Sequence, residues 1–276
     1  MDNEYIVNGK SIIIPGGYGL PNNDPRYFEI PTGFELASFT DHHFSSEIIK
    51  YVGDELRWCS DWGVWLVWTG KCWSDKEHLV SNKLQQVVQI FRGQAFVSLA
   101  EIKPNDKSSE QIAGYCRQKV QKFSNLSRHR SALEYTKPQL AISSLDLNLD
   151  QYLLNFQNCT VDLRTGETKE HQKSDYITKI INHDYNPDAK ADKWNKFVKD
   201  VMGNDDEMVD YVHRVLGYSV NGSTDEQCLF IFYGEGANGK STLAGTCMRL
   251  LGDYSRTVSD DFFCLKTNRG HPTEIA

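Results

Sequence analysis

The sequence predicts an α+β domain that is followed by the beginning of an α/β domain. Three observations lead to this prediction. Residues 62–68 and 72–73 have the alternation and the turn of a β-hairpin. Residues 81–92 and 108–122 have the character of helices. Near the C-terminal end, six consecutive apolar residues, Cys228–Tyr233, lead into a glycine-rich turn and a helical stripe, which is the order strand, loop, helix of an α/β unit.

The composition is that of a globular protein. Hydrophobic residues make up 39% of the 276 residues and charged residues 24%, which excludes a disordered tail, a collagen and a coiled coil. The net charge of -7 provides no overall basic field, so any contact with nucleic acid must be local.

The seven cysteines are odd in number and nowhere spaced as C-x-x-C, so we expect reduced thiols and neither a disulfide framework nor a zinc site. This favours a cytoplasmic localisation. Residues 1–10 lack the apolar block of a signal peptide, and no apolar run approaches the roughly 18 residues of a membrane span. We therefore expect no membrane partner.

Four segments are expected along the chain. Residues 1–44 form an irregular leader, because prolines and glycines recur too densely for long helices, and only Ser11–Ile14 has the pattern of a strand. Residues 45–190 form the α+β domain. Residues 191–225 form a helical bundle, and residues 226–276 form the incomplete α/β domain.

Local patterns define the expected elements within these segments. The first helix begins with a capping serine, Ser45 or Ser46, and Gly217 is expected to stop the last helix of the bundle. The other expected elements are strands at 152–154, 160–163 and 176–181 and helices at 194–201 and 205–216.

Five of the six tryptophans lie between Trp58 and Trp73. Trp62 and Trp68 share a strand face with aliphatic residues, which favours a place in the core, and Trp65 on the other face is the better candidate for an exposed ring. Stacking of these rings on nucleic-acid bases is the alternative.

The segment at residues 117–130 is basic, although the chain as a whole has a negative net charge. No acidic residue interrupts it, and it has two interpretations, a surface that binds nucleic-acid phosphates or a solvated helix face. Its basic residues are Arg117, Lys119, Lys122, Arg128, His129 and Arg130.

The glycine-rich turn matches the phosphate-binding pattern G-x-x-x-x-G-K-[ST]. The glycines permit unusual backbone turns and leave the amide hydrogens open to a phosphate, and Lys240 would bring a positive charge to the β and γ phosphates. Ser241 opens the helix and offers its hydroxyl to Mg²⁺. A glycine-rich turn that happens to lie near a lysine is the structural alternative. The loop consists of Gly234, Glu235, Gly236, Ala237, Asn238, Gly239, Lys240, Ser241 and Thr242.

Hydrolysis needs more than this loop, because an acidic residue at the end of a neighbouring strand must hold the metal and activate water. The acidic residues after Ser241 are Asp253, Asp260, Asp261 and Glu274, and none ends an apolar run. We therefore expect the catalytic carboxylate to be missing from this chain.

Several motifs, in order and spacing, resemble the phage and plasmid primase family, the helicase-primases of satellite phages and poxviruses, whose C-terminal half is a superfamily 3 helicase. The resemblance is strongest from about Asp150 onward. Besides the loop, the motifs are Tyr152–Asn155, Asn158, Val161–Gly166, Asp175–Lys179, Asp184–Tyr185, Leu216–Tyr218, Gly222–Thr224 and Leu250–Tyr254.

The resemblance implies an AAA+ type P-loop fold for the second domain and an ATP-dependent DNA helicase that acts in replication of a phage, plasmid or virus. Its cofactors would be ATP and Mg²⁺, with Lys240 as the catalytic residue. Its partners would be single-stranded or origin DNA and, in the full-length protein, further copies in a hexameric ring. The resemblance also implies that the bundle at residues 191–225 serves as an oligomerisation element of that ring.

Two departures from the family pattern stand out. Cys159 replaces the usual glycine after Asn158. Relatives also continue past the segment that corresponds to Pro272–Ala276 into the acidic strand, the sensor and the arginine finger, so we expect a fragment that is inactive alone.

Two rival functions remain. One is a non-enzymatic DNA-binding or subunit-docking module with a relic phosphate loop. The other is a small-molecule kinase, which the match upstream of the loop disfavours, because kinases normally begin near their phosphate loop.

Overall fold

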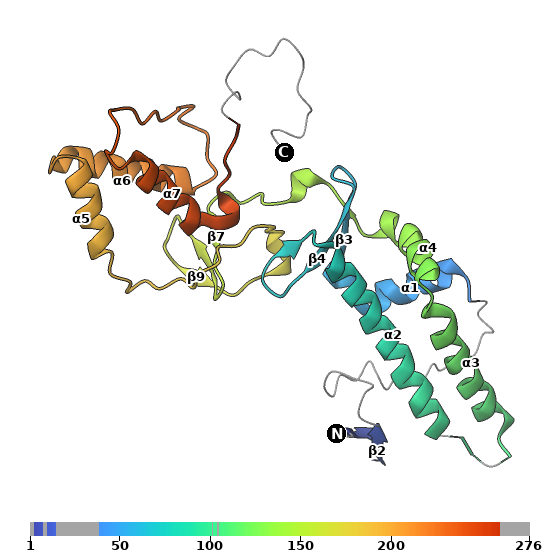
Figure 1. Cartoon of the computed structure of the whole chain (residues 1–276). Helices are drawn as coiled ribbons and strands as arrows, with labels where there is room; N and C mark the ends of the chain where they lie inside the picture. The colour runs from blue at the N-terminus through green and yellow to red at the C-terminus, as the bar shows by residue number, and fades with distance from the viewer. Residues whose placement is uncertain (1–2, 8–9, 15–38, 101, 104, 260–276) are drawn as a thin grey trace, which may run out of the picture. The chain divides into compact units, whose positions relative to one another are not determined.

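The computed structural model describes residues 3–7, 10–14, 39–100, 102–103 and 105–259 (Figure 1). The described residues fall into two compact units. The first unit comprises the residues up to Thr69 together with Trp73–Asp146, and the second comprises Gly70–Cys72 and the residues from Leu147 onward. The boundary near Leu147 divides the segment 45–190 that the sequence analysis treats as one domain. None of the described helices is long and apolar enough to cross a membrane.

A two-stranded antiparallel hairpin opens the chain. Strand β1, Asn3–Val7, pairs with β2, Lys10–Ile14. The strand expected at Ser11–Ile14 is therefore confirmed, and β1 is an additional strand in a segment where only one was predicted. The proline- and glycine-rich remainder of the expected leader, residues 15–38, lies outside the described residues.

Four helices build most of the first unit: α1 (Asp41–Val52), α2 (Glu77–Ala100), α3 (Lys107–Phe123) and α4 (Leu126–Thr136). The helices expected at 81–92 and 108–122 are confirmed, and α2 is longer than expected. The core between the helices contains Phe44, Ile48, Phe91 and Phe123, each at most 1% exposed.

The start of α1 differs from the prediction. The capping residue is Thr40, whose hydroxyl accepts a hydrogen bond from the His43 amide over 3.2 Å. Ser45 and Ser46, the candidate caps, both lie inside α1, and the buried Ser45 hydroxyl accepts a hydrogen bond from Thr136. Helix α4 has no counterpart among the predicted elements, and its first residues lie in the predicted basic segment.

The first unit also contains a four-stranded sheet in the order β5-β4-β3-β6. The pairs β3–β4 and β4–β5 are antiparallel, and β3–β6 is parallel. The strands are β3 (Leu56–Cys59), β4 (Val64–Trp68), β5 (Trp73–Ser74) and β6 (Ala141–Ile142).

The tryptophan assignment needs a correction. Trp62 lies in the turn before β4 and is 49% exposed, so the strand alternation begins at Val64. Trp65 is half-buried and packs against the helical core, whereas Trp68 is buried as expected. Trp62 and not Trp65 is therefore the exposed ring.

In the second unit, three short strands form an antiparallel sheet: β7 (Leu153–Asn155), β8 (Thr160–Asp162) and β9 (Thr168–Lys169). The first two match expected strands. The third expected strand, 176–181, does not form. Tyr176 has φ 46°, which interrupts an extended chain, and beyond it the Ile181 amide donates to the Asn155 carbonyl over 2.8 Å.

Asp162 and Gly166 account for the turn between β8 and β9. The Gly166 amide donates to the Asp162 carbonyl over 2.7 Å, and Gly166 has φ 74°, a conformation that favours glycine. The Asp162 carboxylate accepts from the amide and the guanidinium of Arg164, whose guanidinium also reaches Asp150. Hydrogen bonds to Asp162 therefore hold the Val161–Gly166 motif in a single turn conformation.

Three helices follow, α5 (Asp192–Val201), α6 (Asp206–Val220) and α7 (Lys240–Leu251), and they share a small core of Val198, Val212 and Leu243. Helix α6 continues past Gly217, contrary to the expected stop, because Gly217 keeps a negative φ and the first extended residue is Asn221. Five 3-10 turns complete the described structure: η2 (Gly53–Glu55), η3 (Lys137–Gln139), η4 (Ser144–Asp146), η5 (Lys173–Asp175) and η6 (Gly252–Tyr254).

The apolar run Cys228–Tyr233 is not a buried strand. It has no regular secondary structure, and Ile231 and Tyr233 are 74% and 89% exposed. A strand forms only with a hydrogen-bonded neighbour, and the described residues provide none for this run. The strand that should precede the phosphate-binding loop is therefore not formed here.

Candidate functional site

The phosphate-binding loop wraps around the ammonium group of Lys240. Its Nζ donates to the carbonyls of Gly234 and Glu235 over 2.9 and 3.0 Å and to Oδ1 of Asn238 over 2.6 Å. Lys240 is also the first residue of α7. The loop, the lysine and the positive end of the helix dipole therefore meet at one place, as a phosphate-binding loop requires.

Positive φ angles explain two of the three glycines, and a close contact with Val201 adds to the constraint at Gly239. Gly239 has φ 83°, and a Cβ atom added there would lie 2.6 Å from Cγ2 of Val201. Gly234 has φ 139°, and a Cβ atom there would lie 2.5 Å from Nδ2 of Asn238. At Gly236 an added Cβ atom would meet nothing within 4 Å. The space beside the Gly236 backbone is therefore open.

The hydroxyl-bearing residues after the lysine, Ser241 and Thr242, are exposed at the start of α7. In the described part of the chain, no group of three or more histidines, cysteines or carboxylates is arranged to hold a metal ion. A single hydroxyl is compatible with Mg²⁺, which usually binds through one or two protein oxygens together with phosphates and water. The residues present thus fit a metal that arrives with a nucleotide.

The structure separates the predicted basic residues. Lys119 is 2% exposed, its Nζ donates to the Glu47 carboxylate over 2.7 Å, and the same atom lies 4.1 Å from the centroid of the Phe91 ring. Burial lowers the pKa of Lys119, and Glu47 opposes this shift. The prediction of Lys119 as a nucleic-acid contact is corrected, because this side chain belongs to the core.

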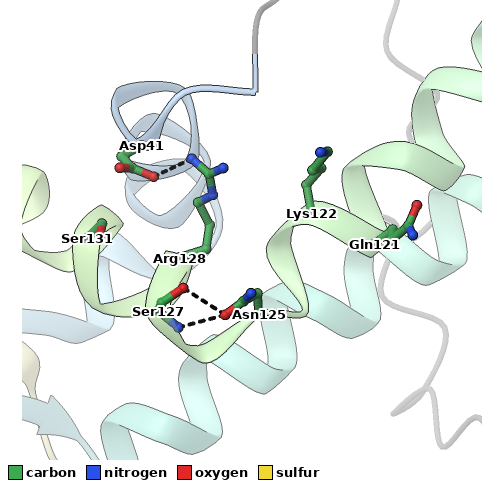
Figure 2. A pocket seen from close by; sticks show the side chains of 7 residues that line it. All are labelled: Asp41, Gln121, Lys122, Asn125, Ser127, Arg128 and Ser131. Atoms are coloured by element: carbon green, nitrogen blue, oxygen red, sulfur yellow. Dashed lines mark hydrogen bonds and ion pairs between the residues drawn. The ribbon is translucent and has the colours of Figure 1, made fainter.

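Lys122 and Arg128 lie together at a polar hollow of about 410 Å³ between the end of α3 and the start of α4 (Figure 2). The Arg128 guanidinium donates to the Asp41 carboxylate over 2.7 Å, whereas no partner of Lys122 is found among the described residues. Every lining side chain is polar or charged. The lining residues are Asp41, Gln121, Lys122, Asn125, Ser127, Arg128 and Ser131.

Asn125 fixes the shape of the hollow. As the N-cap of α4, its Oδ1 accepts from the Ser127 amide and hydroxyl over 2.9 and 2.8 Å (Figure 2). The positive end of the α4 dipole and two cationic side chains therefore face one hollow, against a single carboxylate. This arrangement is suited to an anion such as a phosphate group.

The remaining two predicted contacts, Arg117 and Arg130, are exposed but do not line the hollow. At about 100° per residue, Arg117 is turned away from Lys122 on α3, and Arg130 is on the side of α4 opposite Arg128. Sequence reasoning missed Asp41, Ser127 and Ser131 as members of this site. The capping signal of Asn125 before Leu126 would have located the start of α4.

Asn155 at the end of β7 is a second feature that sequence reasoning missed. It is fully buried, and its side chain makes four hydrogen bonds within the second unit. Its Oδ1 accepts from Thr160 and pairs with Nδ1 of His171, and its Nδ2 donates to the carbonyls of Lys71 and Lys179.

A comparison with protein families decides the classification. The family model described as "D5 N terminal like" matches residues 45–203, which is more than half of the chain. The chain belongs to the D5 N terminal like family. The resemblance to the phage and viral primase-helicase proteins is thereby confirmed. A relative from Acanthamoeba polyphaga mimivirus, named "Putative helicase L207/L206", is 31% identical over 117 residues, which cover 40% of this chain and 12% of that protein.

The two candidate sites lie differently with respect to the D5 N terminal like match. All residues of the hollow except Asp41 lie within residues 45–203, and so does Asn155. The phosphate-binding loop lies beyond the match. The family match therefore includes the hollow and the β7–β9 sheet. The assignment of the phosphate-binding loop rests on the geometry of the loop alone.

Proposed function

We propose that this chain carries the nucleotide-binding loop of an ATP-dependent superfamily 3 DNA helicase, which acts in replication of a phage, plasmid or virus in the host cytoplasm. The observation that supports this proposal is the loop Gly234–Thr242, which surrounds the Lys240 ammonium at the first residue of α7. Membership in the D5 N terminal like family supports the assignment to helicases. A hexameric ring in the full-length protein is part of the same proposal.

The loop residues have separate tasks in this proposal. The ammonium of Lys240 exchanges its carbonyl contacts for the β and γ phosphates, which attract it more strongly because they are charged. The amides around Gly236 donate to phosphate oxygens, and the Ser241 hydroxyl takes a place beside Mg²⁺. Bound Mg²⁺ neutralises phosphate charge.

Binding without sustained turnover is the expected behaviour of this chain alone. The three oxygens that contact the Lys240 ammonium belong to two carbonyls and one amide, and none belongs to a carboxylate. A carboxylate that holds the metal and positions water is needed for rapid hydrolysis.

The test is titration of the purified chain with a fluorescent ATP analogue in Mg²⁺. Saturable binding by the wild type, lost in Lys240→Ala and kept in Lys193→Ala, is the expected result. Lys193 is an exposed lysine on α5 of the same unit and serves as the matched control. Equal binding by all three proteins, or none by the wild type, contradicts the proposal.

A specific observation favours a second candidate function, contact with single-stranded or origin DNA. Lys122 and Arg128 share the polar hollow with the start of α4, where an anion is stabilised. This contact would also serve a non-enzymatic DNA-binding or docking module with a relic loop. Gel shifts across a salt series with wild type, Lys122→Ala and Lys107→Ala test it. Lys122→Ala should make the negative slope of log K against log salt less steep by about one, and Lys107→Ala, at the opposite end of α3, should not.

A further inference from the structure

Helix α7, which begins with Lys240, is held at both ends within the second unit. Its 12 residues span about 18 Å at 1.5 Å per residue. Its middle contributes Leu243, which is 3% exposed, to the core shared with α5 and α6. Because the helix is rigid, a displacement of its C-terminal end also displaces the phosphate-binding loop at its N-terminal end.

The N-terminal end rests on α5. The Gly239 backbone lies so close to Val201 that a Cβ atom would come within 2.6 Å of it, and Phe197 lies 3.4 Å from the same point. The C-terminal residues of α5 therefore pack directly against the junction between the loop and α7.

The C-terminal end is tied to the β7–β9 sheet through Tyr254. The hydroxyl of Tyr254 accepts a hydrogen bond from the Asn155 amide over 3.0 Å and donates to the Lys179 carbonyl over 3.4 Å. Burial raises the pKa of Tyr254 to about 12. Tyr254 is half-buried, and its phenol keeps the proton that it donates to the Lys179 carbonyl.

Asn155 provides a fixed partner for the Tyr254 hydroxyl. Its side chain makes hydrogen bonds with Thr160, His171, Lys71 and Lys179, and these four bonds hold the residue in place. The sheet fixes the position of the Asn155 backbone N–H, so the hydrogen bond forms only when Tyr254 is docked against the sheet.

We infer that Tyr254 is a positioning residue for the phosphate-binding loop, acting through α7, and that nucleotide binding and the Tyr254–Asn155 hydrogen bond stabilise one another. This inference rests on the proposed nucleotide site. If the loop binds nucleotide only while α7 is docked, the apparent Kd equals the intrinsic Kd divided by the docked fraction. By reciprocity, bound nucleotide must favour docking and protect the Asn155 amide.

The experiment compares the wild type with Tyr254→Phe, which keeps the ring and removes the hydroxyl. Tyr185→Phe is the matched control, because Tyr185 is a half-buried tyrosine of the same unit whose ring contacts Phe156 and whose hydroxyl makes no hydrogen bond among the described residues. Two quantities are measured, the Kd of a fluorescent ATP analogue and the hydrogen exchange of the Asn155 and Val161 amides with and without it.

Nucleotide should slow exchange at Asn155 in the wild type and in Tyr185→Phe but not in Tyr254→Phe. The Kd of Tyr254→Phe should rise about two- to tenfold, the range that one hydrogen bond supports. Faster exchange at both Asn155 and Val161 in Tyr254→Phe, with an unchanged Kd, would indicate a purely structural role and overturn the inference. Normal nucleotide binding without any change at Asn155 overturns it as well, while leaving the proposed function intact. Absence of binding by the wild type removes both.

Discussion

The ammonium of Lys119 on α3 donates to the carboxylate of Glu47 on α1 over 2.7 Å, inside the first unit. The two residues are 72 positions apart in the chain. The Lys119 side chain is buried and the Glu47 side chain is 17% exposed, and the Phe91 ring of α2 lies against the ammonium. One ion pair thus holds the three helices α1, α2 and α3 in a defined register.

Removing one member of this pair should destabilise the first unit. In Lys119→Met the Glu47 carboxylate loses its counter-charge, and we expect the free energy of unfolding to fall by about 3 kcal/mol in urea titrations. Lys122→Met, on the same helix but exposed, should change it by about 0.5 kcal/mol or less. In Lys119→Met combined with Glu47→Leu most of the loss should be recovered, because no charge remains buried. An equal loss in the single and double variants contradicts this account.

His129 should make stability depend on pH. The ring is 5% exposed, contacts Phe123 with a centroid distance of 4.6 Å, and has no hydrogen-bond partner at Nε2 among the described residues. Burial lowers its pKa, although a hydrogen bond to the Phe123 backbone acts in the opposite direction. The unfolded chain therefore binds the proton more readily, and stability is complete above about pH 6.5 and declines as the pH falls below it.

The measurement is the free energy of unfolding between pH 5 and 8. Burial lowers the pKa of His43 as well, so His129→Leu should reduce the decline and not abolish it. His78→Gln, at an exposed position on α2, serves as the control and should leave the profile of the wild type. A decline of unchanged size in His129→Leu assigns the effect to other groups.

Gly239→Ala should disrupt the phosphate-binding loop. The new Cβ atom would lie 2.6 Å from Val201, and a left-handed conformation costs a residue with a side chain about 1 kcal/mol or more. We expect loss of binding of the fluorescent ATP analogue and a lower melting temperature of the second unit. Gly236→Ala, where the added atom meets nothing within 4 Å, should melt like the wild type. Equal melting of the two variants shows that Gly239 is not confined by α5.

Arg164 should control the titration of Asp162. Its side chain and backbone donate to the Asp162 carboxylate and lower the pKa of Asp162 to about 2. In Arg164→Ala the pKa should return toward 3.8, the ordinary value, as measured by NMR titration of the carboxyl carbon. The same group stabilises the fold above about pH 4, and this contribution declines as the pH falls toward 2. Lys169→Ala, a more weakly acting neighbour, should move the pKa less.

Elements with a clear local pattern were predictable from the sequence. The helices at 81–92 and 108–122 and the first two strands of the small sheet follow from the spacing of apolar residues, which depends only on neighbours in the chain. The loop residues were also found by their order alone. Their geometry around Lys240 agrees with the chemical task assigned to them.

Features that depend on distant residues were not predictable. Lys119 has the same local sequence environment as its exposed neighbours, and only the fold brings Glu47 to it. The run Cys228–Tyr233 has a strong strand pattern but needs a neighbouring strand to become one. The roles of Asn155 and Tyr254 depend on a contact across 99 positions, which no local spacing reveals.

The short turn between β4 and β5 has a practical consequence for dissecting the protein. Gly70–Cys72 is grouped with the second unit, although the residues on either side of it belong to the first. A fragment that begins at Leu147 would therefore lack the Lys71 carbonyl, and one buried N–H of the Asn155 side chain would be left without an acceptor. The sheet that holds Tyr254 is completed by a loop inserted from far upstream, so cutting the chain at its apparent boundary yields two incomplete pieces.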